Sequence, residues 1–266
     1  MKALTRITST TISALFATAA LTSYAVAADL TVGANIGNVP WEFQNASGET
    51  VGFEIDLISE VGKRLGKSVE FVNVPFNGLF SAVQSGRINM AVSSITITDK
   101  RLESVTFAQP YYDSDQSLTV TAASGITGLS GMEGKVVGVD TGSTGDMWAT
   151  TNGAQYKFGE IRKFEGLSPA MLDLVAGRVD GYISDIPALL YYVKDKPELK
   201  VVERIPTGEK YSVMFNKGDP LAKEVNDVIS TLKKEGFVAK LHETWFGAKA
   251  EDTTSTVMVM DMPVAK

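Results

Sequence analysis

The chain has 266 residues, a net charge of −6, one histidine and no cysteine. This composition excludes disulfides, thiol catalysis and a Cys/His zinc site, and the lack of a basic surplus argues against nucleic acid as a partner. A serine hydrolase would have to use the single histidine, His242, which we expect on the surface of a C-terminal helix. We therefore expect no metal, no cofactor and no catalytic residue.

The first 27 residues have the pattern of a secretory signal peptide. Lys2 and Arg6 supply the positive start, residues 12–21 the apolar centre, and Ala25-Val26-Ala27 the cleavage site. The apolar run is shorter than the roughly 20 residues that span a bilayer, which argues against an uncleaved membrane anchor. We expect cleavage after Ala27 and export of a soluble protein to the periplasm.

Strands and helices alternate along the first part of the mature chain, which predicts a largely parallel sheet. The predicted elements are a strand over 30–33, a helix over 53–65, a strand over 69–74, a short helix capped by Asn77 that ends at 85–86, and a strand over 88–92. The last strand leads into a cluster of hydroxyl side chains. At Thr98 the chain enters a short helical turn, which presents Arg101.

A second unit of the same kind follows. It comprises a strand over 135–139, a loop over 140–145 that enters a helix, a strand over 160–164, a helix started by Ser168-Pro169, a strand over 179–183, a helix capped by Asp185, and a short strand at 201–202.

The two units form an internal repeat. Ser85-Gly86-Arg87-Ile88-Asn89 matches Ala176-Gly177-Arg178-Val179-Asp180 at a constant offset, and the same offset pairs the helix caps Asn77 and Ser168. Several matches in register predict an α/β protein of two similar lobes, each a mainly parallel sheet flanked by helices.

The last part of the chain differs from both units. A strand over 211–215 precedes a helix started by Asp219-Pro220 and a shorter helix that carries Trp245. We expect this segment to return to the first lobe, so that two crossings form a hinge. The expected bounds are 28–112 plus 212–247 for lobe 1, 113–211 for lobe 2, and 248–266 for a C-terminal tail, with crossings near 111–115 and 209–213.

The candidate ligand-binding residues lie where the predicted strands end, because the carboxyl ends of strands in two such lobes face each other across a cleft. The guanidinium of Arg101 is suited to holding a carboxylate through two parallel bonds. The loop at 141–145 opens a helix, whose free N–H groups favour an anion. The hydroxyl candidates are Ser93, Ser94 and Thr96 in lobe 1 and Ser143 and Thr144 in lobe 2.

Asp185 supplies a negative charge for a ligand cation, and together with Arg101 it describes a receptor for a zwitterion. Trp41 and Phe76 are aromatic candidates for the cleft wall, although each taken alone is more often a core residue. Asp185 alone is more often a helix cap, and Arg101 alone a solvated helix charge. Only the joint arrangement favours a binding site.

Six stretches together resemble polar-amino-acid periplasmic binding proteins, the solute receptors of ABC importers, over residues 30–247. They are Val51-Gly52-Phe53-Glu54-Ile55-Asp56-Leu57, Ser93 through Arg101, Phe107-Ala108-Gln109-Pro110-Tyr111-Tyr112, Gly134-Lys135-Val136-Val137-Gly138-Val139, Gly177-Arg178-Val179-Asp180 and Trp245-Phe246-Gly247. The resemblance implies the periplasmic binding protein-like fold of type II, a monomer, and a membrane permease as partner.

The resemblance also implies roles for single residues. Arg101 is similar in position to the clamp of the ligand α-carboxylate, with Thr96, Ser143 and Thr144 as further contacts. Asp185 is similar to the partner of the α-ammonium group.

Three positions depart from the family pattern where selectivity lies. Asn35 stands where members that take lysine, histidine or glutamine tend to have Asp, Asn38 where an aromatic residue is common, and Asp140 where relatives have an apolar residue or Lys. Asp140 would receive a cationic or amide side chain, and with Phe76 a guanidinium would stack. We therefore favour a basic or amide amino acid, while opines and other derivatives remain open alternatives.

Two other functions remain open on the same scaffold. One is an enzyme similar to cyclohexadienyl dehydratases, which would need a general acid in the cleft, a role open to Asp140 or Asp185. The pairing of Arg101 with an ammonium-binding Asp185 disfavours it. The other is a ligand-loaded partner of a chemoreceptor or sensor kinase, which would use the same binding site.

Overall fold

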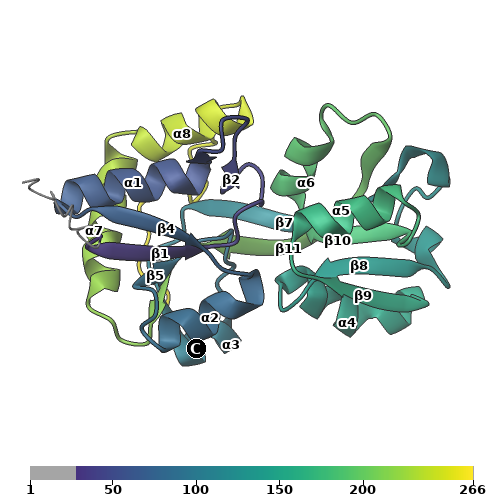
Figure 1. Ribbon diagram of the computed structural model, residues 1–266, viewed down its shortest axis with the longest axis horizontal. Coiled ribbons are helices and arrows are strands. Elements are labelled where there is room, and N and C mark those ends of the chain that lie inside the picture. The colour runs from purple at the N-terminus through teal and green to yellow at the C-terminus, as the bar shows by residue number, and fades with distance from the viewer. Residues whose placement is uncertain (1–27, 266) are drawn as a thin grey trace, which may run out of the picture.

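The computed structural model describes residues 28–265 and shows two α/β lobes, each built on one five-stranded sheet (Figure 1). The predicted signal peptide, residues 1–27, lies outside the described residues. Within the described range, every helix falls short of the length and apolar character that a membrane span requires.

In the sheet of lobe 1 four strands run in one direction and the fifth, β12 (Met214–Asn216), runs antiparallel to them. Its spatial order is β4 (Val69–Asn73), β1 (Leu30–Ala34), β5 (Met90–Ala91), β12 (Met214–Asn216) and β6 (Val105–Phe107). One face is covered by α1 (Phe53–Leu65), α7 (Leu221–Lys234) and α8 (Phe237–Phe246), and the other by α2 (Phe76–Gln84) and α3 (Asp99–Ser104). A small hairpin, β2 (Phe43–Gln44) and β3 (Thr50–Val51), lies beside α1.

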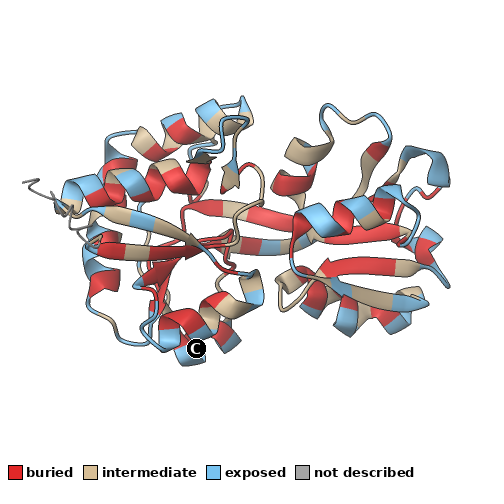
Figure 2. Cartoon of the chain, viewed as in Figure 1, coloured by how far each residue is buried: buried red, intermediate tan, exposed pale blue. Residues whose placement is uncertain are grey.

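The sheet of lobe 2 also has five strands, and helices pack on both of its faces. Its order is β11 (Leu199–Tyr211), β7 (Tyr112–Thr121), β10 (Gly181–Asp185), β8 (Val136–Asp140) and β9 (Glu160–Phe164). The helix α4 (Thr144–Tyr156) packs on one face, and α5 (Leu167–Val175) and α6 (Ile186–Val193) pack on the other. Buried residues lie along the central strands of both sheets and on the helix faces that cover them, as Figure 2 shows.

The predicted fold class is confirmed, and the internal repeat appears in the helix bounds, because α2 and α5 begin and end at the predicted offset. The two predicted caps are wrong. The N-caps lie two residues earlier than predicted, at Pro75 and Gly166, and neither makes a side-chain capping hydrogen bond. In α2 the backbone itself closes the first turn, because the Gly78 N–H donates to the Pro75 carbonyl over 2.8 Å.

The two lobes are joined by β7 and β11, which run antiparallel through the middle of the molecule (Figure 1). The strands predicted at 201–202 and 211–215 are wrong in extent: the first is part of the 13-residue β11, and the second begins only at Met214. The register pairs Asp113 with Lys210, and a bulge interrupts the pairing between Ile205 and Glu209.

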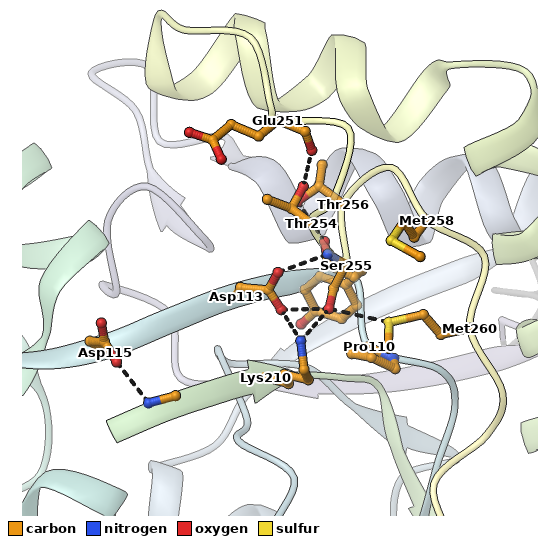
Figure 3. Close-up of polar contacts among 12 residues, drawn as sticks. Pro110, Asp113, Asp115, Lys210, Glu251, Thr254, Ser255, Thr256, Met258 and Met260 are labelled. Atoms are coloured by element: carbon orange, nitrogen blue, oxygen red, sulfur yellow. Dashed lines mark hydrogen bonds and ion pairs between the residues drawn. The ribbon is translucent and has the colours of Figure 1, made fainter. Parts of the chain in front are cut away.

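The C-terminal tail packs along these joining strands (Figure 3). The Ser255 N–H donates to Asp113 over 2.8 Å, and the Ser255 hydroxyl contacts both Asp113 and the ammonium of Lys210. The Thr256 hydroxyl donates to the Tyr111 carbonyl over 3.1 Å. The tail therefore fastens the lobe-1 end of both joining strands.

Candidate functional site

A cavity of about 430 Å³ lies between the lobes, including its opening to solvent. Both lobes supply its wall, which consists of Asn35, Asn38, Phe76, Ser93, Ser94 and Thr96 from lobe 1 and Asp140, Ser143, Thr144, Leu167, Ser184 and Asp185 from lobe 2. Every predicted site residue except Arg101 and Trp41 is in this wall.

Trp41 is a core residue and not part of the cavity, so its prediction as a ligand contact is wrong. Its side chain is fully buried. The indole makes edge contacts with Phe53, Tyr112 and Tyr211, with ring centroids 4.7 to 5.5 Å apart. Packing among aromatic rings in the core stabilises so large an apolar side chain more than a place in the polar cavity wall would.

Arg101 lies behind the cavity wall and bridges the lobes. One terminal nitrogen donates to the Thr96 carbonyl over 2.7 Å and the other to the Gly142 carbonyl of lobe 2 over 3.2 Å. The guanidinium carbon lies 5.5 Å and 5.1 Å from the ring centroids of Phe76 and Phe80. Burial lowers the pKa of Arg101 to about 10, so it remains charged at neutral pH.

The guanidinium of Arg101 keeps unused capacity for an anion. A guanidinium has five N–H donors, and the side chain makes two hydrogen bonds to other described residues. The backbone N–H of Arg101 donates to the hydroxyl of Thr98, which caps α3 as predicted. The cap orients the side chain toward the junction of the two lobes.

The first turn of α4 offers a second group of donors for an anion. Ser143 caps the helix by accepting from the Asp146 N–H over 3.0 Å. The N–H groups of Thr144 and Gly145 have no acceptor among residues 28–265. Free N–H groups at a helix start favour a negative charge.

Glu209 and Gln116 connect the lobes beside the cavity, and the sequence analysis missed both. One Glu209 oxygen accepts from Thr96 over 2.6 Å and from Thr144 over 2.9 Å, which ties the two lobes together. The Gln116 amide donates to the other Glu209 oxygen over 3.0 Å and to Asp185 over 2.6 Å. Only the register of the hinge strands brings these residues to the site, so no local sequence signal marks them.

Asp185 lies at the end of β10 and occupies the N-cap position of α6 as predicted, but its side chain makes no capping hydrogen bond. Its carboxylate accepts from Gln116 and faces the cavity. Burial raises the pKa of Asp185 to about 7, and the negative charge of Glu209 adds to the shift. A ligand cation at this position would reverse the shift.

Asp140 is a second carboxyl group in the same wall, half-buried at the end of the neighbouring strand β8. Its Oδ1 is buried and has no donor among the described residues. Burial raises the pKa of Asp140 to about 7, an effect that the nearby Tyr182 hydroxyl only partly offsets. The cavity therefore presents two carboxyl groups and no cation in its wall.

Within residues 28–265, no group of three or more His, Asp or Glu side chains is arranged to hold a metal ion. The arrangement instead suits a small organic molecule that carries both signs of charge. Anion donors come from Arg101 and α4, and cation acceptors come from Asp140 and Asp185.

Comparison with known proteins places this geometry in a family. The model of the bacterial extracellular solute-binding proteins, family 3, matches residues 30–248. The L-cystine-binding protein TcyJ of Escherichia coli K12 is 31% identical over 217 residues, which is 79% of each chain. The histidine-binding periplasmic protein of Salmonella typhimurium is 29% identical over 241 residues, 87% of this chain and 92% of its own.

A solved structure supports the same assignment. An ancestral arginine-binding protein bound to arginine superposes with a TM-score of 0.77 at 34% identity, and the match covers 82% of this chain and 98% of that one. The chain belongs to the bacterial extracellular solute-binding proteins of family 3.

Proposed function

We propose that the protein binds an amino acid with a second positive charge in its side chain and delivers it to the permease of an ABC importer. The observation that carries the proposal is the pair of half-buried, unneutralised carboxyl groups of Asp140 and Asp185 in one cavity wall. A buried carboxylate without a cation is unfavourable, so a ligand with two positive groups complements this wall.

The ligand α-carboxylate would bind between the lobes. The unused donors of Arg101 and the free N–H groups of Thr144 and Gly145 are the anion-binding groups next to the cavity. Arg101 belongs to lobe 1 and the start of α4 to lobe 2, so one carboxylate would engage both. This geometry favours the closed arrangement of the lobes when ligand is bound.

The α-ammonium group would bind Asp185, and the side chain would extend toward Asp140. Ser94 adds a hydroxyl near Asp185, and Phe76 presents an aromatic ring in the cavity wall. The arginine and cystine in the names of matched proteins each carry a second cationic nitrogen. Arginine, with one carboxylate and two cationic groups, matches a site with two carboxylates and one guanidinium, whereas cystine carries a second carboxylate as well.

The mechanism would be hinge closure between lobe 1 (28–112 and 212–247) and lobe 2 (113–211), with bending in the joining strands. A ligand that touches both lobes shifts the population to the closed form by its difference in affinity for the two forms. We propose that the mature protein acts as a monomer in the periplasm, after cleavage of residues 1–27.

Isothermal titration calorimetry with arginine, lysine, ornithine, cystine and glutamine tests the proposal. Arg101→Ala and Asp185→Ala should each weaken binding by about 2–5 kcal/mol, because each leaves a ligand charge desolvated and unpaired. Circular dichroism of both variants should match that of the wild type. Wild-type affinity in either folded variant would contradict the assigned roles.

An enzyme on this scaffold is the competing proposal, since a pKa of about 7 at Asp140 or Asp185 also suits a general acid. The matched proteins described above are named as binding proteins. Incubation with prephenate or arogenate separates the two proposals, and we expect neither compound to be consumed.

A further inference from the structure

Glu42 and Glu54 form a buried acidic pair that the proposed binding site does not itself use. Both side chains are fully buried. Glu42 lies just before β2, and Glu54 is in the first turn of α1. No ion pair in the described part of the chain involves either carboxyl group. Another interaction must therefore stabilise two carboxyl groups in the core.

One oxygen of each carboxyl group is used to hold the cavity wall. Glu42 Oε1 accepts from the Ser93 hydroxyl over 2.6 Å. Glu54 Oε1 accepts from the Ser94 N–H over 2.8 Å and from the Tyr111 hydroxyl. The pair therefore lies directly behind two consecutive residues of the ligand cavity.

The remaining oxygens, Glu42 Oε2 and Glu54 Oε2, are buried and have no hydrogen-bond partner among residues 28–265. The other oxygens hold consecutive residues, Ser93 and Ser94, so the two carboxyl groups are neighbours in the core. Neighbouring buried carboxylates do not both ionise, and one proton between them would give both unpartnered oxygens a hydrogen bond. Burial, with the charge of Glu54, raises the pKa of Glu42 well above its usual value.

The titratable groups that meet this pair keep the proton in place. Tyr111 touches Glu54 directly, and burial raises the pKa of its hydroxyl, so it stays protonated and donates. Asp185 is reached only through the Ser94 side chain. No cation competes for either carboxyl group in the described residues.

Ser94 is the residue that needs this support. Its φ of 45° lies in the left-handed region, which is strained for a residue with a Cβ. Its N–H is fixed by Glu54, and its hydroxyl accepts from the Asn38 amide over 3.1 Å and contacts Asp185 across the lobes. The strained conformation thus orients a cavity hydroxyl toward the proposed ammonium site.

We propose that Glu42 and Glu54 are positioning residues: by sharing one proton, they hold the Ser93-Ser94 backbone in the geometry that receives the ammonium group of the ligand. This inference rests on the proposed amino-acid binding.

Two substitutions at one position test the shared proton. In Glu42→Gln the amide replaces the protonated carboxyl group, since its NH₂ donates to Glu54 and its oxygen accepts from Ser93. Affinity for the best-binding amino acid should stay within about threefold of the wild type. In Glu42→Leu, similar in size, the donor is lost and affinity should fall at least about tenfold. Glu70→Gln, at an exposed strand position, is the matched control.

Infrared spectroscopy of the ligand-free protein gives a readout independent of binding. At pH 7 the wild type should show a protonated-carboxyl band that Glu42→Gln removes and Glu70→Gln retains. The inference is overturned if this band is absent from the wild-type minus Glu42→Gln difference spectrum, or if Glu42→Gln loses as much affinity as Glu42→Leu. If Glu42→Leu does not fold, the infrared difference spectrum alone tests whether the two carboxyl groups share a proton. A wild type that binds no amino acid would refute the proposed function instead.

Discussion

Replacement of Asp140 by Asn should change which amino acids the protein prefers. The pKa of Asp140 is raised from 3.8 to about 7, chiefly by burial. One pKa unit corresponds to about 1.4 kcal/mol, so leaving this carboxylate without a partner costs on the order of 4 kcal/mol. A ligand cation that pairs with it would recover part of that free energy, about 2–4 kcal/mol.

Asp140→Asn should therefore weaken binding of arginine or lysine by about 30- to 1,000-fold. Affinity for glutamine, which has no second charge, should change by less than about threefold, because an amide at position 140 still offers an oxygen. Calorimetry of both ligand types on wild type and variant measures the difference. Asp195→Asn, at an exposed position in lobe 2, is the control. An equal loss for arginine and glutamine would refute the reasoning and place Asp140 against the ligand backbone.

Three further predictions concern stability. Trp41→Ala should lower the free energy of unfolding by about 3–5 kcal/mol in chemical denaturation, and a variant as stable as wild type would contradict its position in the core. Burial raises the pKa of Asp115, but bonds from Gly208 N–H, Arg204 and Thr207 N–H outweigh it and hold the pKa below its usual value. The stability from Asp115 should thus be present above about pH 4 and be lost as the pH falls. Asp115→Asn should flatten this part of the curve of unfolding free energy against pH, and a variant whose curve matches that of the wild type would contradict the reasoning. Truncation after Gly247 should lower the melting temperature, because Thr256 and Ser255 are buried on the joining strands; an unchanged temperature would show that these contacts add nothing.

The repeat is the part of the fold that the sequence predicts best. A shared offset places the loops after β5 and β10 at equivalent positions, so Ser93, Ser94 and Asp185 could be assigned to one cavity from the chain alone. Local chemistry is equally readable at Thr98, whose hydroxyl caps α3. These features depend on residues close in sequence or repeated in it.

Features that depend on tertiary packing could not be predicted. An aromatic residue in a loop gives no sign of whether it faces a ligand or the core, so Trp41 was misassigned. Glu209 and Gln116 meet only through the pairing of β7 with β11. The N-caps of α2 and α5 lie two residues before the predicted ones, at Pro75 and Gly166, and neither helix start has a side-chain cap that the sequence could signal.

The central claim is that two lobes close on an amino acid that contacts both. Small-angle X-ray scattering, recorded with and without the amino acid that calorimetry identifies, tests it most directly. We predict that the radius of gyration falls on ligand addition and that Arg101→Ala abolishes the change. An unchanged radius in ligand-saturated wild-type protein would contradict the claim.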